Sequence, residues 1–319
     1  MSRLINDNML IEIAHMYYDE HMTQQQIAKK MNISRSLISK SLTKARESGI
    51  VEVIVHSELI RPYKDIEDRL QKVLHLNHVR ICNSDSSIET IAKETGKLLS
   101  TKLSRCKYIV VSGGTTVKSV ADHFSPAINF PNVTFVSANG GLGETHWATD
   151  ANNICITLAQ KCGAQHLQMY APVTVDSAQA KEIFSNQLFI KSVLDKGKQA
   201  DIALVGIGSS LQWSNLENTY LSDQKELYQI DENIICGDLC YNYFDKYGKW
   251  IDCTWNHQII GLHLDDIQKI PEVICVAAGI QKTKSIYIAS RHHLITSLVT
   301  DLNTAKSLLS HYNKELFES

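Results

Sequence analysis

From residue 78 onward, the chain repeats one pattern: a short apolar run, a loop rich in glycine and small hydroxyl side chains, and an amphipathic helical segment. Apolar runs at 108–111, 202–205 and 273–277 each end directly before such a loop, and Ser177 can cap a long helix that ends near Lys196. Continuous apolar runs are typical of strands buried on both faces, and strands alternating with helices form parallel sheets. The pattern therefore predicts an α/β fold in which a Rossmann-like parallel sheet is covered by helices on both sides.

The loops after these runs are the expected ligand site, because ligands bind outside the carboxyl ends of parallel strands. Glycines let backbone N–H groups approach an anion, and a following helix N-terminus attracts negative charge. Lys282 adds a positive charge, and Asp238 can accept hydrogen bonds from sugar hydroxyls. One such loop alone is more simply a tight turn, whereas four on the same kind of edge favour a phosphate-binding crevice. The predicted ligand-binding residues are Gly113, Gly114, Thr115, Thr116, Asn139, Gly140, Gly141, Gly206, Ile207, Gly208, Asp238 and Lys282.

Sequence motifs for nucleotide binding and for catalysis are absent. Neither GxxxxGK[ST] nor GxGxxG follows a strand, the run from Gly206 lacks the third glycine, and no GxSxG or HExxH occurs. Glu144, His146, Asp238 and Asp245 have acid–base chemistry, but nothing in the sequence pairs them. We therefore expect no enzyme activity and no cofactor. The alternative is a phosphosugar isomerase- or deaminase-like enzyme with an accessory N-terminal module.

Eight cysteines are scattered along the chain without a CxxC pair or a zinc-finger spacing, so buried free thiols are expected. A metal site built from Cys236 and Cys240 with a histidine is a weaker alternative, and we expect no metal. No run of 18 or more apolar residues occurs, and the N-terminal segment has no signal-peptide cleavage site. We expect a cytoplasmic protein with no membrane partner.

Basic residues are concentrated in one short segment near the N-terminus. Residues 23–46 carry six lysines and arginines and no acid, although the whole chain has a formal net charge of −2. A basic block on a mildly acidic body indicates a local contact with a polyanion. A solvated helix face would carry the same charges, so the helical pattern around the block has to decide between the two.

Apolar spacing and capping residues predict three helices, one before this basic block and two within it. Residues 6–20 place apolar side chains at helical spacing. Thr23 can cap a second helix with Gln26 as its capping-box partner, and Ser34 can cap a third helix that ends before Gly49. Two short helices joined by a turn of three or four residues form a helix-turn-helix.

The second helix of such a motif enters the major groove of DNA, with its N-terminal residues toward the base edges. Arg35 can donate two hydrogen bonds to a guanine, whereas Lys40, Lys44 and Arg46 suit phosphates. A trihelical dimerisation module with a solvated basic face is the alternative. The predicted DNA-contacting residues are Thr23, Gln24, Ser34, Arg35, Ser36, Ser39, Lys40, Lys44 and Arg46.

A chain of 319 residues exceeds the usual size of one domain, so two domains are expected. The predicted boundaries are 1–56 for a DNA-binding domain, 57–77 for a linker helix and 78–319 for a ligand-binding and oligomerisation domain. Residues 50–56 alternate weakly and can form a strand or a wing. Pro62 opens the linker helix, whose apolar stripe suits packing between domains or against a second subunit.

Eight short motifs follow one another in a set order. They are MTQQQIA at 22–28, ISRSLISK at 33–40, ARESGIV at 45–51, SGGTT at 112–116, ALVGIG at 203–208, GDLCYNYFD at 237–245, VAAGIQK at 276–282 and LVTD at 298–301. Together they resemble the SorC/DeoR-type family of bacterial sugar-responsive transcriptional regulators across nearly the whole chain. The motifs at 203–208 and 237–245 look more similar to the sorbose-regulator branch of that family.

The resemblance implies a second domain of the phosphosugar isomerase/deaminase-like fold and a phosphorylated sugar or polyol as effector. It also implies a homodimer or homotetramer that binds double-stranded, palindromic operator DNA and regulates a carbohydrate-utilisation operon under allosteric control. Gly113 stands where family members commonly have a tryptophan, and Ala278 where a second glycine is common. Asn139 stands where some deoxyribose-phosphate-responsive relatives have a lysine that forms a Schiff base, so covalent capture of the effector is not expected here.

Overall fold

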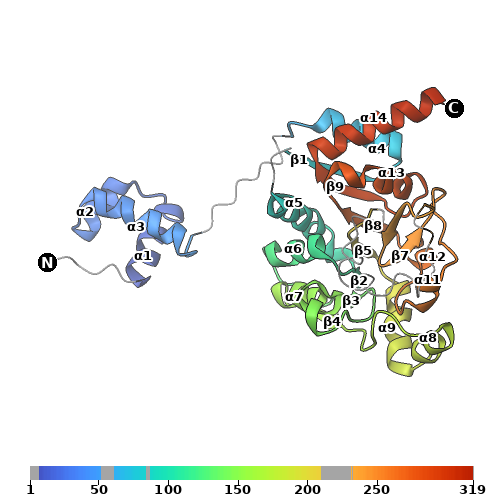
Figure 1. Cartoon of the computed structure of the whole chain (residues 1–319). Helices are drawn as coiled ribbons and strands as arrows, with labels where there is room; N and C mark the ends of the chain where they lie inside the picture. Colours follow the sequence, from blue (N-terminus) through green and yellow to red (C-terminus); the bar gives the residue numbers. More distant parts are fainter. Residues whose placement is uncertain (1–6, 52–60, 84–86, 210–230, 232, 319) are drawn as a thin grey trace. The chain divides into compact units, whose positions relative to one another are not determined.

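The chain divides into two compact units, Met1–Pro62 and Tyr63–Ser319 (Figure 1). The structure is a computed structural model that describes residues 7–51, 61–83, 87–209, 231 and 233–318. Most of the segment 50–56, for which a strand or wing was expected, lies outside these residues. Within the described ranges, no helix is both long enough and apolar enough to cross a membrane.

In its described residues, the first unit contains the three predicted helices: α1 (Asp7–Tyr18), α2 (Gln24–Met31) and α3 (Arg35–Glu47). Thr23 and Gln26 form the predicted capping box at α2, with both reciprocal hydrogen bonds present. The Oγ of Ser34 accepts the N–H of Leu37 at 3.2 Å and caps α3. The three helices enclose a small apolar core of Ile13, Met16, Ile27, Ala28, Ile38 and Leu42.

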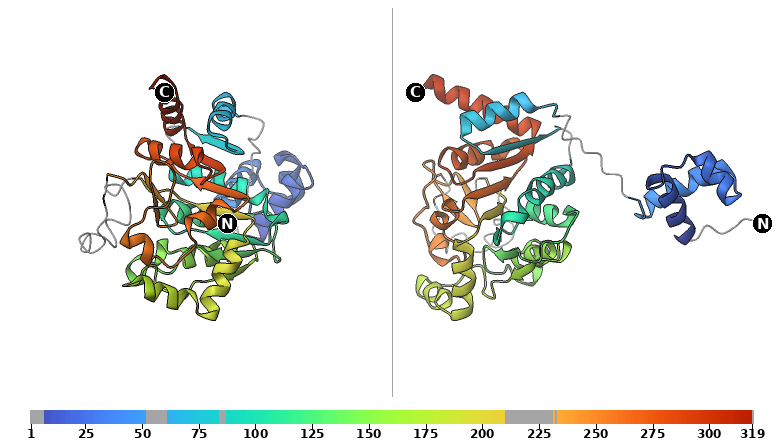
Figure 2. Two further views of the ribbon diagram at one scale, coloured as in Figure 1. Left: turned by 90° about the vertical axis from the view of Figure 1, so that its right-hand side faces the viewer. Right: turned by 180° about the vertical axis from the view of Figure 1, so that it is seen from behind.

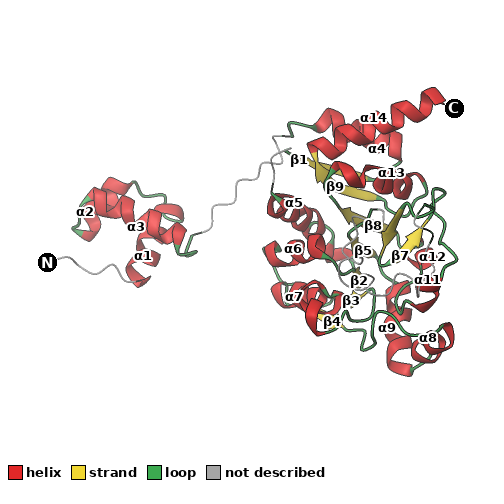
Figure 3. Cartoon of the chain, viewed as in Figure 1, coloured by secondary structure: helices red, strands yellow, loops and turns green. Residues whose placement is uncertain are grey.

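The second unit is built on a sheet of seven parallel strands, which confirms the predicted fold class (Figure 3). The strand order is β1-β9-β8-β5-β2-β3-β4. The register between the central pair aligns Ile109 with Ile202 and Val111 with Leu204. The strands are β1 (His78–Cys82), β2 (Tyr108–Val111), β3 (Thr134–Ser137), β4 (Gln165–Leu167), β5 (Ile202–Val205), β8 (Glu272–Val276) and β9 (Ser297–Asp301).

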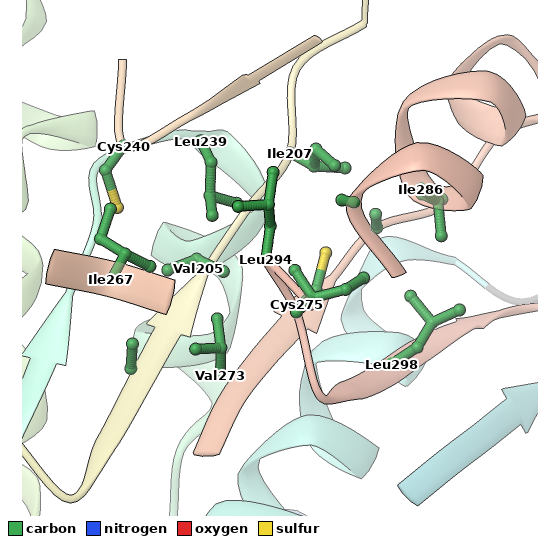
Figure 4. Packing of buried hydrophobic residues seen from close by; sticks show 14 of the residues in the cluster. Val205, Ile207, Leu239, Cys240, Ile267, Val273, Cys275, Ile286, Leu294 and Leu298 are labelled. Carbon is green, nitrogen blue, oxygen red and sulfur yellow. The ribbon is translucent and has the colours of Figure 1, made fainter. Parts of the chain in front are cut away.

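Alternate residues of each strand enter two separate cores, one on each face of the sheet. Val110 and Val205 belong to the first core, whereas Ile109 and Leu204 belong to the second. Figures 1 and 2 show the helices in two corresponding layers, and Figure 4 shows part of the first core. The first core is covered by α4 (Lys64–Leu74), α9 (Leu188–Lys198), α12 (Leu264–Gln268), α13 (Thr283–Arg291) and α14 (Leu302–Glu318), and the second by α5 (Ile88–Ser100), α6 (Thr115–His123) and α7 (Ala151–Lys161).

Two expected helices take a form that the sequence did not indicate. The expected linker helix is α4, and it buries Leu70 and Leu74 in the core of the second unit. The single long helix expected after Ser177 is wrong. It divides into α8 (Ala178–Ser185) and α9, because Gln187 has an extended backbone with φ −62° and ψ 131°.

A short antiparallel hairpin, β6 (Gly237–Leu239) and β7 (Asn242–Phe244), lies apart from the main sheet. Its two turn residues, Cys240 and Tyr241, both have left-handed backbones, with φ 49° and 63°. Left-handed values at both positions give a turn whose twist matches that of the strands, although glycine or asparagine is the usual occupant. Hydrogen bonds from α11 (Thr254–Gln258) and from two asparagines hold this turn in place, as described below.

Candidate functional site

A cavity of about 90 Å³ lies beyond the carboxyl ends of β2 and β5. These strands are neighbours, but the chain continues from β2 to β3 on one side and from β5 to β8 on the other. Ligands of open α/β sheets bind at such switch points. The cavity is lined by Ser112, Gly113, Gly114, Thr115, Thr116, Val117, Gly206, Ile207, Gly208, Asp238, Cys240, Tyr241 and Lys282.

The structure brings nine of the twelve predicted ligand-binding residues into this wall and leaves three outside it. The three are Asn139, Gly140 and Gly141. The backbone N–H of Gly140 donates to the carbonyl oxygen of Ile260, and that of Gly141 donates to Ala171. This loop follows β3, so it lies one strand away from the switch point and is tied to the chain around it.

The loops after β2 and β5 are joined by one side chain. The Oγ of Ser112 accepts the N–H of Gly206 at 3.2 Å and donates to the carbonyl oxygen of Gly113 at 3.0 Å. Gly114, with φ 115°, is the N-cap of α6 and provides no side-chain cap. The first turn of α6 therefore faces the cavity without a carboxylate or hydroxyl at its cap, and the helix dipole favours an anion there.

Asp238 reaches the cavity from β6, where its backbone pairs with the loop after β5. The N–H of Gly208 donates to the carbonyl oxygen of Asp238 at 3.1 Å, and residue Asp238 is 9% exposed. Burial raises the pKa of Asp238 to about 6, while the charge of Lys282 and the N–H of Tyr241 act in the opposite direction. At neutral pH the carboxylate is ionised and desolvated, so it favours hydroxyl donors from a ligand.

Lys282 provides the cation of the cavity. Burial lowers the pKa of this lysine, while the nearby Cys275 and Asp238 act to raise it. The ammonium group has lost water contacts, and an anionic ligand would replace them with a charge-assisted hydrogen bond. Its turn is fixed by Gly279, whose N–H donates to the Oδ2 of Asp301 at 3.0 Å and to the Oγ1 of Thr304 at 2.8 Å.

The hairpin that carries Asp238 is held by buried amide side chains. The Nδ2 atoms of Asn139 and Asn242 both donate to the carbonyl oxygen of Cys240, at 3.0 Å each. The Nε1 of Trp255 donates to the carbonyl oxygen of Tyr241 at 2.8 Å. Asn139 therefore positions the turn next to the cavity, although it does not line the cavity itself.

Sequence reasoning missed Tyr241, whose hydroxyl lies directly above Gly113. A Cβ atom built on Gly113 would lie 2.4 Å from that hydroxyl and 2.9 Å from the carbonyl oxygen of Thr149. The segment around Tyr241 contains no glycine or asparagine at the turn positions, so no local signal marked a hairpin. Ser112, Val117 and Cys240 also line the cavity but were not among the predicted ligand-binding residues, although Ser112 and Cys240 lie within the motifs at 112–116 and 237–245.

The remaining candidate acid–base residues have other roles or positions. The Oδ1 of Asp245 accepts the N–H groups of Tyr247 and Lys249, so this carboxylate closes a surface turn. His146 is absent from the cavity wall, and the side chain of Glu144 is outside the described part of the structure. Among the described residues, no group of three or more His, Cys, Asp or Glu side chains is arranged to hold a metal ion.

All the predicted DNA-contacting residues except Gln24 are exposed on the first unit. Arg35, Ser36, Ser39, Lys40 and Lys44 are exposed along α3. Thr23, Ser34 and Arg46 are also exposed, whereas Gln24 is half-buried. The hydroxyls of Thr23 and Ser34 already cap helices, so these two side chains fix the helix ends as well as facing solvent.

Comparison with known proteins agrees with this geometry. Residues 60–310 match the Sugar-bind family of sugar-binding domains, and residues 12–48 match region 4 of sigma-70. The chain is 27% identical over 314 residues to the transcriptional regulator LsrR of Enterobacter sp. (strain 638), covering 96% of this chain and 94% of the relative. It is 31% identical over 251 residues to the central glycolytic genes regulator of Bacillus subtilis (strain 168), covering 76% and 71%.

Among solved structures, the full-length sorbitol operon regulator SorC of Klebsiella pneumoniae has the same fold. It superposes with a TM-score of 0.80 at 24% identity and covers 96% of this chain and 99% of that one. Two relatives that match nearly the whole chain, LsrR and the deoxyribonucleoside regulator of Bacillus subtilis (strain 168), are both named as regulators. The chain belongs to the Sugar-bind family, in the SorC/DeoR-type group of sugar-responsive transcriptional regulators with an N-terminal helix-turn-helix.

Proposed function

We propose that this regulator is controlled by a phosphorylated sugar or polyol that binds in the cavity between the β2 and β5 loops. The observation that carries the proposal is the pairing of two features in one cavity. The first turn of α6, without a side-chain cap, and Lys282 favour a phosphate, and the buried carboxylate of Asp238 favours hydroxyl groups. A phosphorylated sugar or polyol carries both groups in one small molecule.

The volume of the cavity supports a small ligand. About 90 Å³ is below the range of roughly 300–1,000 Å³ that drug-sized ligands occupy. In our proposal the phosphate lies against Gly114, Thr115 and Thr116, and the hydroxyls lie toward Asp238. Gly206, Ile207 and Gly208 form the floor. Asn139 contributes by holding the hairpin through Cys240, whereas Gly140 and Gly141 bond to Ile260 and Ala171 outside the cavity wall.

On the DNA side, we assign sequence reading to α3. Arg35 contacts a base edge, and Ser36 and Ser39 lie beside it. Lys40, Lys44 and Arg46 contact phosphates, which provide affinity but no sequence information. Thr23, Gln24 and Ser34 contact the DNA backbone from the helix N-termini.

The proposed regulator works as an allosteric switch on a palindromic operator of a carbohydrate-utilisation operon in the cytoplasm. Two or four copies present paired helix-turn-helix units, and the effector changes how strongly they bind. A coupling free energy of about 1–3 kcal/mol would change DNA affinity roughly 5–150-fold. The functional domains in this proposal are 1–56, 57–77 and 78–319.

A thermal-shift screen of the full chain tests the ligand class. A ligand that binds only the folded state raises the melting temperature. We expect a shift with some sugar or polyol phosphates, a smaller shift with inorganic phosphate, and none with the matching unphosphorylated sugars. A DNA titration at fixed salt then measures the coupling. If a phosphosugar binds but leaves DNA affinity unchanged, the switch is refuted.

A further inference from the structure

Five large apolar side chains form an exposed surface on α8, α9 and the loop after β4, here called the α8–α9 patch. The exposed fractions are 88% for Leu188, 67% for Tyr170, 63% for Ile183, 53% for Phe189 and 36% for Phe184. The rings of Tyr170 and Phe189 contact each other with centroids 5.7 Å apart, so the loop and α9 form one surface. Monomeric proteins rarely expose contiguous apolar patches larger than a few hundred Å², and larger ones mark interaction sites.

This patch is preformed. Ser177 caps α8 through a hydrogen bond from the N–H of Ala180 at 3.1 Å. The Nζ of Lys181 donates to the carbonyl oxygen of Asn256 at 3.2 Å and fastens α8 to α11. Even so, α8 buries none of its residues. A helix that is held in place while its apolar side chains face solvent is typical of a binding surface.

The patch adjoins an edge of the main sheet that no other strand of the described residues covers. β4 is the last strand in the sheet order and pairs on one side only, with β3. Its residues Gln165 and His166 are exposed, and Tyr170 follows three residues after the strand. Figure 1 shows β4, α8 and α9 at the same end of the second unit. Proteins usually cover or shorten such edges, and a neighbouring molecule would cover this one.

We propose that the α8–α9 patch is the surface through which two copies of this chain assemble. The proposal rests on the proposed function, because the described part of each chain holds one helix-turn-helix, while such motifs read paired half-sites as dimers. The charges of the two helices also suit a second copy. Glu182 on α8 and Lys191 on α9 are both exposed. A two-fold interface pairs residue i with j and j with i, so it can place each of these charges opposite the other.

The full chain without DNA is the material for the test, and its mass in solution is measured by sedimentation velocity at several concentrations. We expect Leu188→Asp and Ile183→Asp to halve the mass or to weaken association at least tenfold, because each places a charge in the interface. Both residues are exposed, so the folded unit tolerates the change. Ile128→Asp is the matched control, since Ile128 is 64% exposed but lies in the loop between α6 and β3. It should leave the mass unchanged.

Exchanging the charges of Glu182 and Lys191 makes the test of the interface more specific. Glu182→Lys alone should weaken assembly, and Glu182→Lys combined with Lys191→Glu should restore it. A monomeric wild-type chain, patch variants that keep the wild-type mass, or equal loss in Ile128→Asp would each overturn the assignment and point to a different partner for the patch. These measurements contain neither DNA nor effector, so a failure of the proposed switch would leave them unaffected.

Discussion

Replacing Gly208 by alanine should damage the effector site while leaving the fold of the sheet intact. A Cβ atom built on Gly208 would lie 1.6 Å from the Oδ1 of Asp238, so the carboxylate has to leave its position. Gly206, in the same loop, offers a matched control. A Cβ atom there would lie 3.6 Å from the Cγ2 of Val117, an ordinary van der Waals contact.

The magnitude follows from the contact that is lost. A hydrogen bond to a charged group contributes about 1.5–3 kcal/mol, and about 1.4 kcal/mol corresponds to a tenfold change in affinity. Gly208→Ala should therefore weaken effector binding by roughly 10–150-fold. Overpacking should also lower the free energy of unfolding by about 1–3 kcal/mol. Gly206→Ala should change the free energy of unfolding little, and it should weaken effector binding less than Gly208→Ala, because its Cβ atom leaves Asp238 in place.

Calorimetric titration of both variants with the sugar phosphate that stabilises the wild type most is the assay. Urea unfolding checks the fold, and DNA affinity without effector should match that of the wild type. Equal effector affinities for the two alanine variants would show that Asp238 does not bind the ligand. Loss of DNA binding in Gly208→Ala would show that the substitution acts through unfolding instead.

Arg35→Ala should weaken binding to the operator by about 1–3 kcal/mol and binding to random DNA by little. Lys44→Ala should weaken binding to both DNAs and reduce the slope of log affinity against log salt concentration by about one. Equal loss of affinity for both DNAs in Arg35→Ala would contradict base reading. Burial raises the pKa of Asp238 to about 6 in the folded protein, whereas the unfolded chain keeps the ordinary value of 3.8. The free energy of unfolding therefore falls as pH rises from 3.8 to 6, by roughly 3 kcal/mol at most. Asp238→Asn should therefore be more stable than the wild type at pH 7.5 but not at pH 4, as urea unfolding at both pH values will measure, and a gain at both would refute the pKa argument. Thr23→Ala should destabilise the first unit by about 1 kcal/mol in thermal unfolding, because the capping box is lost, and a neutral result would contradict that role.

The fold class was predictable because its signals are local. The apolar runs at 108–111 and 202–205 are buried strands, and the capping residues Thr23 and Ser34 start helices where expected. The strand order was not predictable, since which strands become neighbours depends on packing between distant segments. The break between α8 and α9 carries no proline or glycine, so no local residue marks the end of the helix there.

The candidate site was predictable where a residue follows a central strand directly. Gly113 and Gly208 belong to the loops after β2 and β5, the two strands at the switch point. Asn139 follows β3 in the same way, but β3 lies one strand further out, and no local pattern reports that distance. Tyr241 enters the wall through a turn of two non-glycine residues, and it is held there by tertiary hydrogen bonds that no short motif encodes.

The turn that carries Lys282 is anchored from behind by the chain's last strand and helix. Gly279 is bonded to Asp301 at the end of β9 and to Thr304 in the first turn of α14, and neither residue reaches the ligand cavity. A truncation that removes α14 would thus release the cavity's cation without deleting a single lining residue. A chain truncated before Thr304 should therefore fail to bind, in a ligand screen, an effector that the full chain binds.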